Sequence, residues 1–170
     1  MRLTLRSTLV ALFMAAIAGC GFQLRGSYDL PYESIYLAVA DYSLVGAGLK
    51  RAIRSSGSTR IANSAQDAQA TFQPTGETRL PIILSLSSAG RVREKRLSYR
   101  YSYRIVDIKG RDLVLPVTVE INRDLTYADS DVLAKTQEED LLWRDMEKDL
   151  VQQLMRRLAA VKPITPADPE

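Results

Sequence analysis

Six basic side chains lie close together in the middle of the sequence and could bind an anion. They are Arg91, Arg93, Lys95, Arg96, Arg100 and Arg104, with one acid, Glu94, among them. Arginine forks form paired hydrogen bonds with phosphate, and clustered positive charge attracts polyanions. The alternative is a solvated hairpin tip whose charges prevent edge-to-edge aggregation. The charges alone favour neither interpretation.

Groups suited to catalysis or metal binding are scarce. The 170-residue chain contains no histidine, the commonest general base and metal ligand, and its only cysteine is Cys20. Ser98 and Ser102 therefore have no histidine to activate them. The three consecutive acids at 138–140 would point in different directions from a helix, so a shared acid–base pair is not expected. We expect no enzymatic activity, no cofactor and no metal.

Cys20 follows a segment with the features of a bacterial secretion signal. Arg2 and Arg6 precede an apolar run at 9–17, which is shorter than the roughly 20 residues that span a bilayer. The residues Ile-Ala-Gly at 17–19 then lead into Cys20. This pattern resembles the lipobox of bacterial lipoproteins, in which the chain is cut before an acylated cysteine. The alternative is a signal anchor or a small buried cysteine.

Acylation of Cys20 would anchor the protein stably, because more than one acyl chain is attached. The next residue is Gly21 rather than Asp, which by the sorting rule for Gram-negative lipoproteins predicts the periplasmic side of the outer membrane. There, phosphorylated lipopolysaccharide is the anion expected at the basic residues, and nucleic acid is not a partner. Loss of 1–19 removes two of the 23 basic residues, leaving 21 against 20 acidic ones.

Apolar periodicity predicts the elements that position these residues. Strands are expected at 34–40, 79–88, 97–106 and 113–121, the second beginning early at 70–73 and interrupted at Pro74, and helices at 44–55 and 135–160. The segment 58–69 is expected to be a linker. Ser43 and Gly57 are the expected caps of the first helix. Gly46 and Gly48 within it are interpreted as positions of close packing.

The strand at 97–106 has the cleanest alternation. Tyr99, Tyr101 and Tyr103 share one face and are expected in the core, whereas the arginines share the other. Trp143 lies at the margin of the apolar stripe of the last helix, where it could contact the core or a partner. The next strand is expected to point five apolar residues inward: Leu113, Leu115, Val117, Val119 and Ile121. Pro116, between them, indicates a sheet edge or a bulge.

These elements predict an α+β fold. We expect a two-layer sandwich in which a four-stranded, mainly antiparallel sheet has two helices packed on one face. A single domain at 20–162 is followed by a proline-rich tail at 163–170 that is expected to be disordered. The helix-free face of the sheet would be polar and carry the arginines.

Several segments together resemble one family. They are CGFQLRG at 20–26, YSYRIVD at 101–107, the proline-containing strand that ends at Arg123, LAK at 133–135, and Gln153 with RRL at 156–158. Over nearly all of its mature length the chain is similar to the LptE family of lipopolysaccharide-assembly lipoproteins, and the CGF-x-LRG segment is the most specific part of the likeness.

The resemblance implies a non-enzymatic subunit of the outer membrane. LptE-like proteins plug the LptD β-barrel, help it assemble and bind lipopolysaccharide during its export to the cell surface. The family's lipopolysaccharide contacts correspond to Arg91, Arg93, Lys95, Arg96 and Lys135 of this chain. The alternative is a lipid-anchored structural or binding lipoprotein for another anionic polymer of the envelope.

Overall fold

The computed structural model describes residues 28–127 and 132–160. The predicted signal at 1–19, Cys20 and the predicted tail at 163–170 lie outside these residues. The elements in chain order are β1 (Ser34–Leu37), α2 (Leu44–Ser56), β2 (Arg60–Ile61), a short 3-10 helix (Ala65–Asp67), β3 (Ala70–Leu86), β4 (Val92–Val106), β5 (Asp112–Thr126) and α3 (Val132–Ala160).

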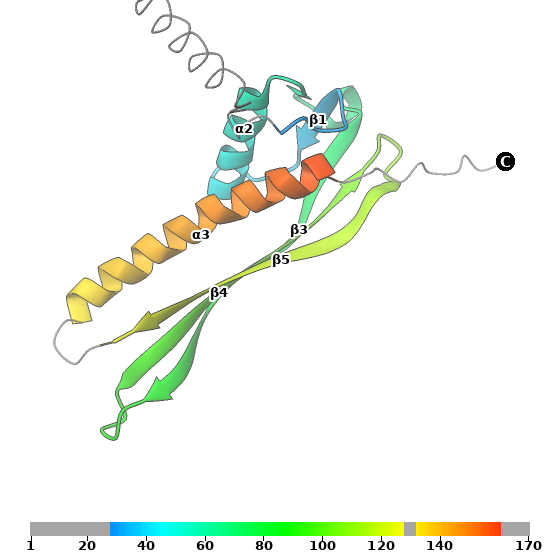
Figure 1. Ribbon diagram of the computed structural model, residues 1–170. Coiled ribbons are helices and arrows are strands. Elements are labelled where there is room, and N and C mark those ends of the chain that lie inside the picture. The colour runs from blue at the N-terminus through cyan, green and yellow to red at the C-terminus, as the bar shows by residue number, and fades with distance from the viewer. Residues whose placement is uncertain (1–27, 128–131, 161–170) are drawn as a thin grey trace, which may run out of the picture.

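The elements form two layers, with α2 and α3 on one face of a single sheet (Figure 1). The strand order is β2-β1-β3-β4-β5. The short β1 pairs in parallel with β2 and β3, whereas β3, β4 and β5 form two consecutive antiparallel hairpins. The α+β prediction is confirmed. The fifth strand, β2, lies inside the predicted linker, because two residues are too few to produce an apolar alternation.

Three strands are longer than predicted, and one of them is β5, which continues past residue 121 to Thr126. β3 continues through Pro74, where the pairing with β4 shifts register between Pro74 and Gly76. A β-bulge absorbs the proline, so the strand bends without ending. β4 begins at Val92 instead of Leu97. Most of the basic segment is therefore strand, and this fixes the sides from which Lys95 and Arg96 project.

Packing between β4 and α3 forms the centre of the core. On β4, Leu97, Ile105 and the three tyrosines between them are at most 1% exposed, as are Met146, Leu150, Leu154 and Leu158 of α3. Four-residue spacing places the α3 side chains along one ridge of the helix. The predicted core role of the tyrosines is confirmed. Trp143 is partly buried and meets Tyr99 edge to face, with ring centroids 6.3 Å apart.

The expected inward row of β5 is wrong at one position. Leu115 is 61% exposed, whereas Val119 and Ile121 are buried. The β4–β5 pairing passes from Tyr103–Val117 to Ile105–Val114, so β5 has one extra residue there. The bulge lies beside Pro116, and it turns Val114 toward the core and Leu115 outward. The predicted bulge and sheet edge are both present, since β5 is the last strand.

Helix α2 begins and ends at the predicted caps. The Ser43 hydroxyl accepts a hydrogen bond from the Gly46 amide at 3.0 Å, and Gly57 adopts a left-handed φ of 74°. A Cβ on Gly48 would lie 2.7 Å from Cγ2 of Val151, so glycine permits the close approach of α2 to α3. Within the described ranges, neither helix is long and apolar enough to cross a membrane.

This contact predicts that the effect of Gly48→Ala on the free energy of unfolding depends on the residue at position 151. Gly48→Ala should lower the free energy of unfolding by about 1 kcal/mol, because overpacking against Val151 outweighs the gain in helix propensity. In a Val151→Ala background the same change should be neutral or stabilising, because the clash is absent. Urea unfolding of the four proteins in this cycle measures both effects. Equal effects of Gly48→Ala in the two backgrounds would contradict the assigned contact.

Candidate functional site

Alternation along β4 divides the basic residues between the two faces of the sheet. The buried tyrosines at 99, 101 and 103 face the helices. Lys95, at an odd-numbered position, therefore lies on the helix side, and Arg96, at an even-numbered position, lies on the helix-free side. The structure thus separates Arg96 from Lys95, whereas at Arg93 the β3–β4 pairing shifts register.

On the helix-free face, the arginines of β4 pair with acids of β5. The Arg96 guanidinium donates two hydrogen bonds to Asp124, at 2.7 and 2.8 Å. These bonds raise the pKa of Arg96 and lower that of Asp124. Arg100 lies 3.5 Å from Glu120, and Arg104 lies 3.6 Å from Asp112. This face is therefore a ladder of compensated charges, as the register predicts for opposite charges on adjacent strands.

On the helix side, Lys95 links the hairpin to α3. Its Nζ lies 2.7 Å from Glu139 Oε2, the Tyr127 hydroxyl donates to the same oxygen at 3.1 Å, and both charged side chains are about one-fifth exposed. The hydrogen bond to Glu139 is the main cause of the raised pKa of Lys95. Burial opposes ionisation of Glu139, but the hydrogen bonds from Lys95 and Tyr127 outweigh it and lower its pKa.

This contact brings the start of α3 to the hairpin, which is the condition under which Lys135 could join the site. Lys135 lies one helical turn before Glu139. Its Nζ forms an ion pair with Glu138 Oε2 at 2.7 Å. Lys135 and Lys95 therefore lie at the same end of the molecule, each with a carboxylate that an anionic ligand would have to displace or share.

The turn of the β3–β4 hairpin carries Arg91 and Arg93, both exposed. Gly90 supplies the positive φ, 72°, that the turn requires. The Arg93 carbonyl accepts a hydrogen bond from the Tyr127 amide at 2.8 Å, which fixes the backbone. Among the described residues, none pairs with the Arg93 guanidinium. We call Arg91, Arg93, Lys95 and Lys135 the basic end, and in it Arg93 is the cation most available to a ligand.

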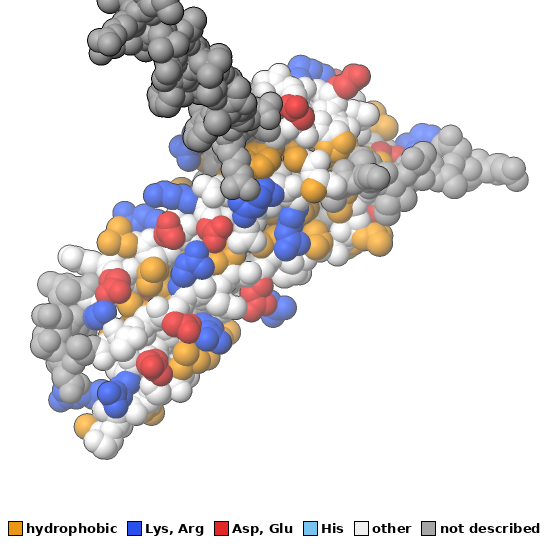
Figure 2. Space-filling view, in the orientation of Figure 1, with side chains coloured by type: hydrophobic (Ala, Val, Ile, Leu, Met, Phe, Trp, Pro, Cys, Tyr) orange, Lys and Arg blue, Asp and Glu red, His pale blue; other side chains and the backbone are white. Residues whose placement is uncertain are grey.

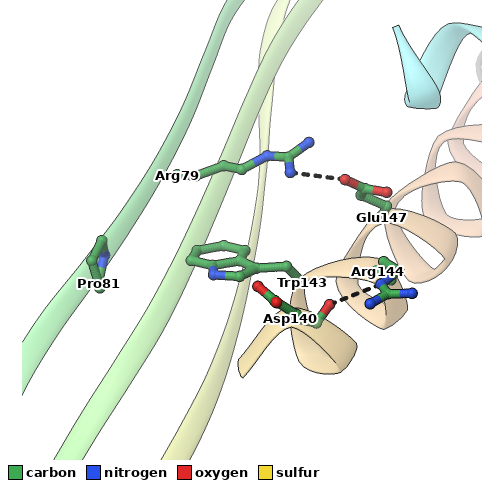
Figure 3. A pocket seen from close by; sticks show the side chains of 6 residues that line it. All are labelled: Arg79, Pro81, Asp140, Trp143, Arg144 and Glu147. Atoms are coloured by element: carbon green, nitrogen blue, oxygen red, sulfur yellow. Dashed lines mark hydrogen bonds and ion pairs between the residues drawn. The ribbon is translucent and has the colours of Figure 1, made fainter. Parts of the chain in front are cut away.

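A second charged cluster, which the sequence analysis missed, lies under α3. Figure 3 shows Arg79 of β3 reaching toward Glu147 of α3, and their atoms are 2.8 Å apart. Arg79 also lies 3.2 Å from Glu77 and stacks 4.7 Å above the Tyr99 ring. Trp143 borders the same hollow of about 420 Å³. Arg79 is paired with both Glu77 and Glu147, so we assign this cluster to the attachment of α3 to β3.

The pairing register of β3 and β4 would have predicted this cluster. Arg79 is paired with Tyr99 and therefore faces α3. The sequence shows a lone arginine in an apolar strand, but only pairing with β4 decides its side. No group of three His, Cys, Asp or Glu side chains suited to a metal ion occurs among residues 28–127 and 132–160.

The Lys95–Glu139 pair makes stability depend on acid pH. Because the folded pKa of Glu139 is lowered, its contribution is complete above the ordinary glutamate pKa and is lost as pH falls through the folded value. Glu139→Gln should therefore lower the free energy of unfolding at pH 7 by about 0.5–1.5 kcal/mol. The difference from the wild type should shrink toward zero as pH falls from 5 to about 3.

Urea unfolding at a series of pH values measures this difference. Glu138→Gln is the matched control, since Glu138 is on the same helix but its side chain is 48% exposed. A difference between Glu139→Gln and the wild type that stays constant across the acid range would exclude the proposed linkage.

Comparisons with known proteins give a consistent result. The family model described as "LptE: Lipopolysaccharide-assembly" matches residues 32–158. A relative named LPS-assembly lipoprotein LptE, from Yersinia pestis (strain Pestoides F), is 26% identical over 164 residues, covering 95% of this chain and 78% of the relative. The protein of that name from Yersinia pseudotuberculosis (strain YPIII) matches with the same identity and coverage.

Solved structures share the fold. The solution structure of uncharacterized lipoprotein B from Nitrosomonas europaea has a TM-score of 0.70 and 37% identity, covering 82% of this chain and 91% of that one. A minor lipoprotein from Acinetobacter baumannii, at 22% identity, has a TM-score of 0.66 over 81% of this chain and 99% of its own, which is a likeness of fold. The family match runs from before β1 into the last turn of α3 and includes the basic end.

Proposed function

Because the chain belongs to the LptE family of lipopolysaccharide-assembly proteins, we propose that it binds lipopolysaccharide and plugs the LptD β-barrel, which it also helps to assemble. The family is non-enzymatic, and the prediction that this protein is not an enzyme is confirmed by membership. The proposal places the protein on the periplasmic side of the outer membrane, held there by acylated Cys20. The five predicted contact residues remain candidates within it.

The observation that carries lipopolysaccharide binding is the basic end. Arg93 is exposed at the hairpin and has a fixed backbone, while Lys95 and Lys135 lie at the same end of the molecule. A phosphate held by the Arg93 guanidinium would also attract the two lysines, because each lysine keeps its positive charge while it is paired with a carboxylate. Figure 2 shows Lys and Arg side chains gathered at the end of the molecule where this hairpin turns. Arg96 is less suited, because Asp124 already occupies its fork.

Arg93→Glu should weaken lipopolysaccharide binding about ten-fold, because it replaces an attraction for phosphate with a repulsion. The fold should survive, since no described residue forms an ion pair or a side-chain hydrogen bond with the Arg93 guanidinium. Titration of the mature lipoprotein with labelled lipopolysaccharide measures the affinity, and the loss should diminish as ionic strength rises.

Arg51→Glu is the matched control, because Arg51 is an exposed arginine of α2, on an element away from the hairpin. It makes the same change of net charge and should alter the affinity less than two-fold if local contact matters more than total charge. Equal losses in the two variants, or no loss with Arg93→Glu, would remove the basic end from the site.

The helix-free face of the sheet supports the barrel partner. Three cross-strand ion pairs, Arg96–Asp124, Arg100–Glu120 and Arg104–Asp112, compensate its charges. The hydroxyls of Ser102 and Thr118 are hydrogen-bonded to each other at 2.8 Å between these pairs. The lumen of a membrane β-barrel is polar, and the β4–β5 part of this face, where each of the three arginines is paired with an acid, can pack there.

The partner proposal predicts stoichiometric co-purification. A mild-detergent extract of outer membranes should yield a large β-barrel with the tagged protein at a ratio of one to one. Quantitative mass spectrometry of the eluate measures the ratio, with another tagged outer-membrane lipoprotein as the control. Recovery of the protein alone, or with another anionic envelope polymer in place of the barrel, would favour the alternative of a free-standing binding lipoprotein.

A further inference from the structure

The distal half of β3 exposes an unusual number of aliphatic side chains. Leu80, Ile82, Ile83, Leu84 and Leu86 are between 39% and 56% exposed. A strand of a two-layer sandwich normally buries every second residue, so one exposed aliphatic face would already need an explanation. Here consecutive residues are exposed on both faces. We call these five residues the apolar edge.

The apolar edge follows from the topology. β1 pairs with β3 only at residues 70–72, so beyond Phe72 no described strand lies along that side of β3. The register pairs Leu80 with Ser98 and Ile82 with Arg96, which puts both aliphatic side chains on the helix-free face. Leu80 and Ile82 therefore project away from α2 and α3, and neither helix covers them.

The basic end lies along the same hairpin. Ile83 is paired with Lys95, and Leu86 is paired with Val92, which is flanked by Arg91 and Arg93. Ile82 is likewise paired with Arg96 on the helix-free face. Aliphatic side chains of β3 thus lie beside cations of β4 at several positions of the distal hairpin, on both of its faces. This surface has the two chemistries of an anionic amphiphile, with positive charge for phosphate and aliphatic area for hydrocarbon.

The backbone of this edge is poorly suited to a protein strand. Pro81 has no amide hydrogen to donate, and the β3–β4 pairing shifts register at Pro74–Gly76 and again from Ile83 to Leu86. Prolines and bulges interrupt the regular hydrogen-bonding row that an added strand would need. What the apolar edge offers is therefore side-chain hydrocarbon, and complementarity with the adjacent cations selects an acylated anion.

We propose that the apolar edge binds the acyl chains of the same phosphorylated glycolipid whose phosphates meet the basic end. This inference rests on the proposed function and adds a hydrocarbon subsite to it. The hairpin then binds the amphiphile across the boundary between its charged and apolar parts. Each aliphatic side chain covered by an acyl chain contributes in proportion to the area removed from water.

The test compares two ligands that differ only in their hydrocarbon. One is intact lipopolysaccharide, and the other is the same material stripped of acyl chains by alkali with its phosphates retained. The mature lipidated chain, held in amphipol, should bind the intact form about ten-fold or more tightly than the stripped form. Equal affinity for the two ligands would overturn the inference.

A pair of double variants locates the subsite. Leu80→Ser with Leu84→Ser should bring the affinity for intact lipopolysaccharide down to that for the stripped form. It should leave binding of the stripped form within about two-fold of wild type, which also shows that the variant is folded. The matched control is Ile108→Ser with Leu115→Ser, at positions 63% and 61% exposed in the β4–β5 hairpin. Equal losses in the edge variant and the control would overturn the inference.

Two other occupants give different outcomes. Vesicles of phosphatidylglycerol and phosphatidylethanolamine test for insertion into a bilayer. If they bind the wild type, and if the edge variant loses vesicle binding as much as it loses lipopolysaccharide binding, the edge inserts into a bilayer and the proposal is wrong. If the edge variant converts a dimer into a monomer in light scattering, the occupant is a second copy and the proposal is also wrong. Failure to bind either form of lipopolysaccharide would instead count against the proposed function itself.

Discussion

The packing of α3 against the aromatic face of β4 is the interaction on which the rest of the structure depends. Leucines and a methionine spaced by four along α3 meet a row of buried tyrosines spaced by two along β4. Burial is the largest cause of the raised pKa of Tyr99 and Tyr101, so both phenols stay neutral. Arg79 extends the contact from β3, through Glu147, to the margin of α3. Helix and sheet are thereby joined along most of the helix.

Both helices pack on the same face of the sheet, and this affects the chemistry of both faces. The helices bury one face of the sheet, so the opposite face must be compatible with water or with a polar partner. Arg96 and Arg100 are opposite acids on β5, Arg104 lies near Asp112, and the Arg96–Asp124 pair is the best formed of the three. Isolated exposed ion pairs contribute little stability, so we interpret the ladder mainly as control of charge on a surface that stays exposed or docks.

The functional proposals rest on what the helices leave uncovered. β3 and β4 continue past the region where β1 supports the sheet (Figure 1). Their hairpin carries both cations and exposed aliphatic side chains. Ion pairs at Lys95 and Lys135 moderate the charge at this end, while Arg93 stays available. Such an arrangement suits reversible binding of a charged amphiphile, because the protein's own carboxylates compete with the ligand. It offers no activated nucleophile, in agreement with the non-enzymatic family.

The sequence by itself determined the main elements of the fold. Apolar alternation identified the tyrosine face, helical spacing identified the ridge of α3, and Ser43 and Gly57 marked the ends of α2, because these signals depend on neighbouring residues alone. The family likeness was also visible in the chain, as was the segment before Cys20 that resembles a lipobox. The sequence could not show the two-residue strand β2, whose short parallel pairing leaves no periodic pattern.

Only the tertiary structure decided what each charged or aliphatic side chain faces. The bulge beside Pro116 turned Leu115 outward, and the β3–β4 register placed Leu80 on the helix-free face. Alternation split the cations, which put Arg96 against Asp124 and Lys95 against Glu139. The physical reason is that a strand's side chains alternate, so a bulge of one residue reverses every face beyond it. Pro116 indicated one bulge in the sequence, but only the pairing between strands shows which residues that bulge turns toward the core and which it turns outward.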